Sequence, residues 1–276
     1  MKKSIATVNN RTLSALLTLL EDENLEIASL AMEKFLEMGT LTDETIAEYQ
    51  ESHNPQLRHR IHQLSSVLEL RRRRNEFVDD VKAAKLSLWQ GLLRVNTLYD
   101  PTFPVDGVTD MVADLARELN AKPVTTAKMT AFMRDQEFSV PSEDLLDAEL
   151  YLVERVIGTR YGASALLCAL AQRLGTLTNW ESTICLHEGR FCLLDRRFML
   201  IDPAEGWDVT TPEGKDRYHI CSRKDVLLAV LCQLFLVALV DGNLRDLHHF
   251  GTLLTGLNDD DLGELPFPIG KIAGLD

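Results

Sequence analysis

The stretch SALLCALAQRLGTLTNWESTICLHEGRFCLLDRRFMLIDP, residues 164–203, decides the fold because the spacing of its apolar residues changes midway. Its first part, from Ser164 to Leu174, is almost entirely apolar and predicts a buried helix that ends at Gly175. The apolar period then shortens toward two, which predicts short antiparallel strands joined by turns. These strands are expected at Ser182–His187, Phe191–Leu194 and Phe198–Ile201. A buried helix followed by such strands predicts an α+β fold with a small antiparallel sheet.

Helical spacing of apolar residues continues on both sides of this stretch, so we expect the fold to be mostly helical. Upstream, helices are expected at Phe77–Tyr99, Val105–Leu119 and Ala127–Gln136, and another is expected to open at Pro141. Downstream, helices are expected at Lys224–Val240 and Leu244–Leu257. Together these elements predict one domain over residues 77–276, with a helical subdomain at 77–157, a core helix and sheet at 158–210, and closing helices at 224–257.

An internal repeat precedes this domain, within residues 1–76. Leu20–Gly39 and Gln50–Leu70 each begin with a polar turn and continue as a helix with one apolar face. This pattern resembles HEAT repeats, although a helical bundle with accidental similarity remains the alternative. Because two such repeats are too few to fold alone, we expect the helix from Phe77 onward to cover their apolar stripe within one continuous core. The stripe consists of Leu16, Leu20, Ile27, Ala31, Leu57, Ile61 and Leu64.

Composition excludes several classes of protein. Hydrophobic residues make up 45% of the chain and charged residues 26%, which is an ordinary globular balance. A formal net charge of −13 argues against nucleic acid or an anionic membrane as a partner. The start of the chain lacks the uninterrupted apolar run of a secretion signal, and Val226–Val240 is too short to span a bilayer. Five cysteines without a repeated spacing predict reduced thiols and a cytoplasmic location.

Five stretches of the larger domain form an ordered set. They are Leu98–Pro101 with Pro104–Asp106, Leu150–Val156 with Gly158, Ala169–Gly175, Gly189–Phe191, and Ile201–Pro203 with Gly206. Their order and spacing resemble the bacterial transglutaminase-like superfamily, in its "core 2" Sir-B-type branch, over about two thirds of the chain. In such enzymes a cysteine at a helix start is the nucleophile, a histidine on the next strand is the base, and an aspartate on the following strand orients the histidine.

The resemblance places arginines where the nucleophile and the base would stand. Arg160 takes the cysteine position and Arg190 the histidine position, so only Asp202 matches. Arginine stays protonated at physiological pH and can serve neither role. The resemblance therefore implies a catalytically inactive protein, without a cofactor, that acts as a protein-interaction or regulatory module through its HEAT-like helices. We expect Asp202 to pair with Arg190 or Arg160, and the three side chains could instead bind an anionic ligand.

Two other interpretations use the sulfur and imidazole side chains. Relocated catalysis, as a cysteine-dependent hydrolase or acyltransferase, would use Cys185 and His187, which share one face of a strand. A metal site would draw on Cys185, His187, Cys192, His219 and Cys221. The spacings lack the close Cys–Cys pair of structural zinc sites, so no metal is expected. Cys168 and Cys232 lie on apolar helix faces and are expected to be buried.

Overall fold

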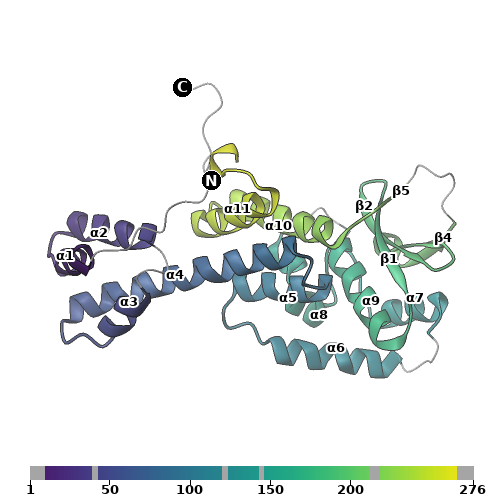
Figure 1. The fold of residues 1–276 in the computed structure, drawn as a ribbon. Helices are drawn as coiled ribbons and strands as arrows, with labels where there is room; N and C mark the ends of the chain where they lie inside the picture. Colours follow the sequence, from purple (N-terminus) through teal and green to yellow (C-terminus); the bar gives the residue numbers. More distant parts are fainter. Residues whose placement is uncertain (1–9, 39–42, 120–123, 143–145, 212–217, 266–276) are drawn as a thin grey trace. The chain divides into compact units, whose positions relative to one another are not determined.

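The computed structural model describes residues 10–38, 43–119, 124–142, 146–211 and 218–265. Within these residues the chain forms eleven α-helices and one five-stranded antiparallel sheet (Figure 1). Two compact units make up the chain, Met1–Glu76 and Phe77–Asp276. None of the helices in the described part combines the length and the apolar character that crossing a lipid bilayer requires.

The first unit has a hydrophobic core of its own. Its helices are α1 (Asn10–Leu20), α2 (Leu25–Met38), α3 (Asp43–Tyr49) and the first part of α4 (Pro55–Lys82). The buried side chains are Leu16, Leu17, Leu20, Ala31, Phe35, Ile46, Leu57, Ile61 and Leu64. The prediction of one continuous core with the helix after Phe77 is wrong, because this stripe packs among the unit's own helices. Phe35 of α2, which is fully buried, supplies the large side chain that fills the space between them.

Helices α2 and α4 begin in the same way. The Asn24 Oδ1 atom accepts a hydrogen bond from the Glu26 backbone N–H at 2.9 Å. The Asn54 Oδ1 atom accepts one from the Gln56 backbone N–H at 3.0 Å. Asparagine is a favoured residue at a helix start because its side chain satisfies a backbone donor that the helix leaves unpaired.

The helix expected at Phe77–Tyr99 is two helices. Helix α4 ends at Lys82, the backbone turns through Ala84 with a φ of +53°, and α5 (Leu88–Tyr99) begins after Ser87. Ser87 and Gln90 form a capping box in which each side chain bonds the other residue's backbone N–H. This reciprocal cap starts a new helix, which the apolar stripe alone does not reveal.

The remaining helices of the second unit follow the prediction with two exceptions. They are α6 (Val105–Leu119), α7 (Thr126–Asp135), α8 (Val153–Thr159), α9 (Ser164–Thr178), α10 (Arg223–Val240) and α11 (Leu244–Asn258). The helix expected from Pro141 is instead a 3₁₀ turn at Ala148–Tyr151 followed by α8; residues 143–145 lie outside the described part. Helix α9 continues past Gly175 to Thr178, where Asn179 ends it in the left-handed conformation and the Trp180 backbone N–H donates to the Gly175 carbonyl oxygen at 2.9 Å.

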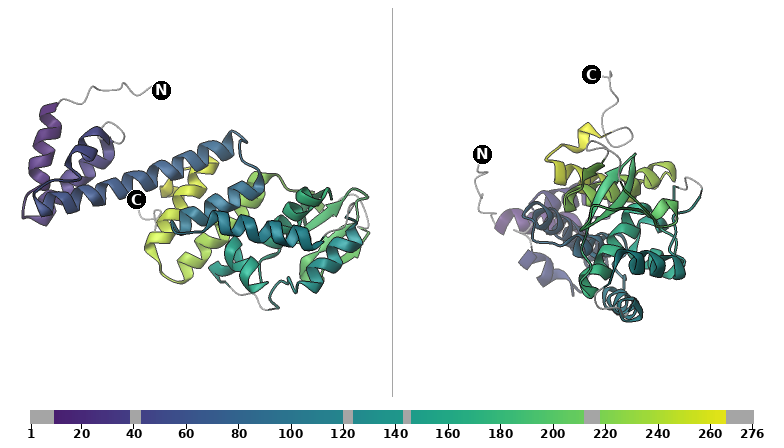
Figure 2. Two further views of the ribbon diagram at one scale, coloured as in Figure 1. Left: turned by 90° about the horizontal axis from the view of Figure 1, so that it is seen from below. Right: turned by 90° about the vertical axis from the view of Figure 1, so that its right-hand side faces the viewer.

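The sheet has the strand order β4-β3-β2-β1-β5, and Figure 2 shows it beside α9 at one end of the second unit. Its strands are β1 (Ser182–His187), β2 (Arg190–Asp195), β3 (Leu200–Asp202), β4 (Asp208–Thr210) and β5 (Tyr218–Ile220). Strand β1 has the predicted bounds, whereas β3 begins two residues late. Phe198 lies in a tight turn with a φ of +59°, held by the Asp195 carboxylate, which accepts the Met199 backbone N–H at 2.9 Å. Ile184, Leu193 and Ile201 join α9 in the main core.

Candidate functional site

The hairpin that joins β1 and β2 fixes the position of Arg190. Its two turn residues, Glu188 and Gly189, have φ values of +50° and +81°. Positive φ at both positions defines the type I′ turn, whose twist matches that of the paired strands. The turn therefore pairs His187 directly with Arg190 at the end of the hairpin.

Strand β3 and the 3₁₀ turn that follows it bring two carboxylates to Arg190. The Arg190 Nη2 atom lies 3.3 Å from the Asp202 Oδ2 atom, and Nη1 lies 2.5 Å from the Glu205 Oε1 atom. The other Asp202 oxygen accepts the Ala204 backbone N–H at 2.8 Å, which caps the 3₁₀ turn at Pro203–Glu205. The hydrogen bond that Arg190 donates to Glu205, followed by the charge of Asp202, raises the pKa of Arg190 above its usual value. The predicted Arg190–Asp202 pair is thus present, with Glu205 as an additional partner that the sequence analysis missed.

Arg160 has a different environment. It ends α8 in the left-handed conformation, with a φ of +68°. Its guanidinium carbon lies 4.6 Å from the centre of the Phe138 ring, a cation–π arrangement. The Arg160 Nη1 atom is buried and forms no hydrogen bond with any described residue. The structure therefore does not bring Arg160 into an ion pair with Asp202.

A chain of hydrogen bonds connects the two arginine environments. The Trp207 indole Nε1–H donates to the Phe138 carbonyl oxygen at 2.7 Å. The Trp207 backbone N–H donates to the Asp202 carbonyl oxygen at 2.9 Å. Phe138 and Trp207 were not expected as site residues. An unusual backbone marks Trp207, since its φ is +65°, but no sequence pattern announces that conformation for a tryptophan.

The charge balance of this site differs from the expected one. One arginine lies between two carboxylates, instead of two arginines facing one carboxylate. The sum of these three charges is negative, which disfavours the binding of an anionic ligand at Arg190. Only the backbone donors and the Arg160 guanidinium would remain for such a ligand, and Arg160 is held over the Phe138 ring.

None of the five thiols is activated. Burial raises the pKa of Cys168 well above its usual value and raises the pKa of Cys185 to about 12. Desolvation by neighbouring atoms is also the largest cause of the raised pKa of Cys192, of Cys221, and of Cys232, whose side chain is nevertheless exposed. Cys168 is the fifth residue of α9, past the first turn whose free N–H groups would favour a thiolate, and its Sγ–H donates to the Phe191 carbonyl oxygen at 3.5 Å.

The relocated dyad and the metal site lack the required geometry. No hydrogen bond joins Cys185 to His187, whose Nδ1 atom is buried and has no hydrogen-bond partner among the described residues. His219 pairs with Leu186, so it lies on the sheet face opposite to Cys185 and His187. In the described part of the chain no group of three or more His, Cys, Asp or Glu side chains is placed to hold a metal ion.

Cys232 is exposed, so the prediction that it would be buried is wrong.

We expect iodoacetamide at about pH 8 to modify Cys232 first, at a rate no faster than that of glutathione. A raised thiol pKa lowers the thiolate fraction at this pH, so the rate should climb as the pH approaches the pKa. Mass spectrometry of timed samples measures this, and Cys232→Ser should remove the fastest phase. Faster modification of Cys168, Cys185 or Cys192 than of glutathione would reveal an activated thiol.

Comparison with known proteins adds no assignment, since no family model, curated protein or solved structure matches the chain. The chemistry of the site must then be judged from its own geometry. That geometry is an arginine held between Asp202 and Glu205 on a small sheet, beside thiols that are all protonated at neutral pH.

Proposed function

We propose that this chain is a catalytically inactive protein with a transglutaminase-like domain and HEAT-like helices, which acts as a protein-interaction or regulatory module in the cytoplasm. The observation that carries the proposal is the ion pairing of Arg190 with Asp202 and Glu205. The resemblance places the catalytic histidine at this position. An arginine whose pKa is raised by two carboxylates cannot accept a proton from a thiol.

The state of the cysteines supports the same proposal over its enzymatic alternative. A cysteine hydrolase needs a thiol that loses its proton near neutral pH, next to a base within hydrogen-bond reach. Cys185 has a pKa of about 12 and makes no hydrogen bond with His187. Five unpaired thiols also suit a reducing compartment.

We propose that the partner protein binds the first unit. Two of its leucines on α2 project outward, Leu25 with 73% and Leu30 with 66% of their surface exposed, although Ala28, Ala31 and Phe35 of the same helix are buried. Helix-pair repeats commonly present such outward positions to partners, while their inward positions hold the unit together.

A photo-crosslinking amino acid at Leu25 or Leu30, introduced into the full chain in its host cells, tests this assignment. We expect one discrete cross-linked species from these positions, identified by mass spectrometry. The matched control is Leu244, which is 67% exposed but belongs to the second unit. Cross-links from Leu244 alone would place the interaction on the wrong unit, and their absence from all three positions would argue against an interaction function.

A further inference from the structure

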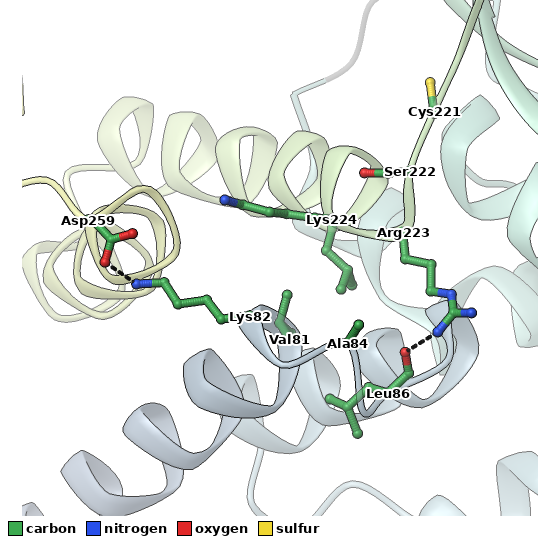
Figure 3. A pocket seen from close by; sticks show the side chains of 10 residues that line it. Val81, Lys82, Ala84, Leu86, Cys221, Ser222, Arg223, Lys224 and Asp259 are labelled. Carbon is green, nitrogen blue, oxygen red and sulfur yellow. Dashed lines mark hydrogen bonds and ion pairs between the residues drawn. The ribbon is translucent and has the colours of Figure 1, made fainter.

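The second unit contains a pocket that the Arg190 site does not use. It has a volume of about 680 Å³, which suits a small organic molecule. Three segments form it: the end of α4 with the loop that follows, the start of α10, and Asp259 after α11 (Figure 3). The pocket is therefore built from parts of the chain that are distant in sequence but belong to one compact unit.

The lining of this pocket is positively charged in a strongly acidic chain. Lys82, Arg223 and Lys224 contribute three positive charges, and Asp259 contributes the one carboxylate among the lining residues. The net charge of the lining is therefore +2, in a protein whose formal net charge is −13. The first turn of α10 adds the positive end of an 18-residue helix, which the Asp225 carboxylate in the same turn partly offsets.

Two of the cations are held in place, and the third is available. Lys82 forms an ion pair with Asp259, and the Arg223 Nη1 atom donates a hydrogen bond to the Leu86 carbonyl oxygen at 3.1 Å (Figure 3). Lys224 forms no hydrogen bond and no close ion pair with any described residue. Its charge acts on Asp259 only at longer range. Such an ammonium group in a pocket can bond a ligand without first breaking a contact.

The remaining wall is apolar and fixed. Val81, Ala84, Leu86 and Leu227 provide its aliphatic surface. Leu227 packs directly on Gly91 of α5, where a Cβ atom would lie 2.8 Å from the leucine Cδ1 atom. The loop beyond α4 is held by a hydrogen bond from the Lys85 backbone N–H to the Asp80 carbonyl oxygen at 3.0 Å. A pocket with this pre-formed shape binds ligands without a large ordering cost.

We infer that this pocket binds a small amphipathic phosphate monoester, with the phosphate at Lys224 and Lys82 and an apolar body against Leu227 and Leu86. A phosphate monoester carries nearly two negative charges at neutral pH, which matches the net charge of the lining. Phosphate oxygens are also favoured partners of lysine ammonium groups. The inference is independent of the proposed interaction function.

Phenyl phosphate is the probe, and the methyl NMR signals of Val81, Leu86 and Leu227 in the full chain are the readout. We expect these signals to shift saturably with phenyl phosphate, more weakly with inorganic phosphate, and not with phenol. Lys224→Gln should weaken binding about tenfold, since it removes a charge-assisted hydrogen bond. Lys128→Gln, at an exposed lysine of α7 outside the pocket, should leave it unchanged.

The variant Asp259→Asn should change the affinity for phenyl phosphate in the opposite direction from Lys224→Gln. It removes the carboxylate that competes with the phosphate for Lys82, so we expect affinity for phenyl phosphate to rise about threefold. General damage to the fold would lower affinity instead. Equal binding of inorganic and phenyl phosphate would overturn the amphipathic class of ligand. An absence of saturable shifts at these methyl groups, or full binding by Lys224→Gln, would overturn the site itself.

Discussion

Trp207→Ala is expected to lower the free energy of unfolding of the second unit by about 3–5 kcal/mol. The Trp207 side chain is 1% exposed and belongs to the main core, so its removal leaves a large cavity. The change also deprives the Phe138 carbonyl oxygen of its indole donor. Urea unfolding followed by the fluorescence of Trp89 and Trp180 measures the loss, because both remaining tryptophans lie in the second unit.

Trp207→Phe separates the two contributions. Phenylalanine keeps most of the apolar volume but leaves the Phe138 carbonyl unpaired, which should cost about 1–3 kcal/mol. The alanine variant must therefore be the less stable of the two. A loss below about 1 kcal/mol for Trp207→Ala would mean that the surrounding side chains collapse into the cavity, contrary to the tight packing of this core.

Phe35→Ala is expected to unfold the first unit while the second unit stays folded. Phe35 is fully buried at the centre of that unit's core, and its truncation should cost about 3–5 kcal/mol. A unit of this size, Met1–Glu76, has a total stability of roughly 4–11 kcal/mol, so the truncation would remove a large share of it. Circular dichroism should show part of the helix melting at lower urea, whereas tryptophan fluorescence should keep its original midpoint.

The control for this experiment is Leu30→Ala on the same helix. Leu30 is 66% exposed, so its truncation should change the stability by less than about 0.5 kcal/mol. A fluorescence midpoint that falls together with the circular dichroism signal would contradict separate cores. Such a result would support the single continuous core that the apolar stripe predicts.

The sequence predicts the long helices because each needs only a repeated apolar face. Helix α6 has the predicted bounds, since Pro104 precedes it and Val108, Val112 and Leu115 recur at helical spacing. Strands β4 and β5 are only three residues long and were not predicted, because three residues cannot establish an alternating pattern. Helix α9 passes the glycine at 175 and ends at Asn179, because asparagine also adopts the left-handed conformation that closes a helix.

Some contacts of the candidate site could likewise be predicted from the sequence, and others could not. The Arg190–Asp202 pair could be predicted because the resemblance aligns both residues with positions of one site, although it left Arg160 as the alternative partner. The position of Arg160 over Phe138 could not, since it depends on one residue in the left-handed conformation at the end of α8. Glu205 reaches Arg190 through the 3₁₀ turn that Asp202 caps, a turn too short to be read from spacing.

The brevity of the two outermost strands has a consequence for self-association. An exposed sheet edge offers unpaired backbone groups to any other chain, and long flat edges seed intermolecular sheets. Among the described residues, both edge strands, β4 and β5, are three residues long, and β4 carries the exposed Asp208 and Thr210. A second molecule would gain few backbone hydrogen bonds by extending this sheet. We therefore expect concentrated protein to resist amyloid-like growth from these edges, even though the central strands are rich in leucine and isoleucine.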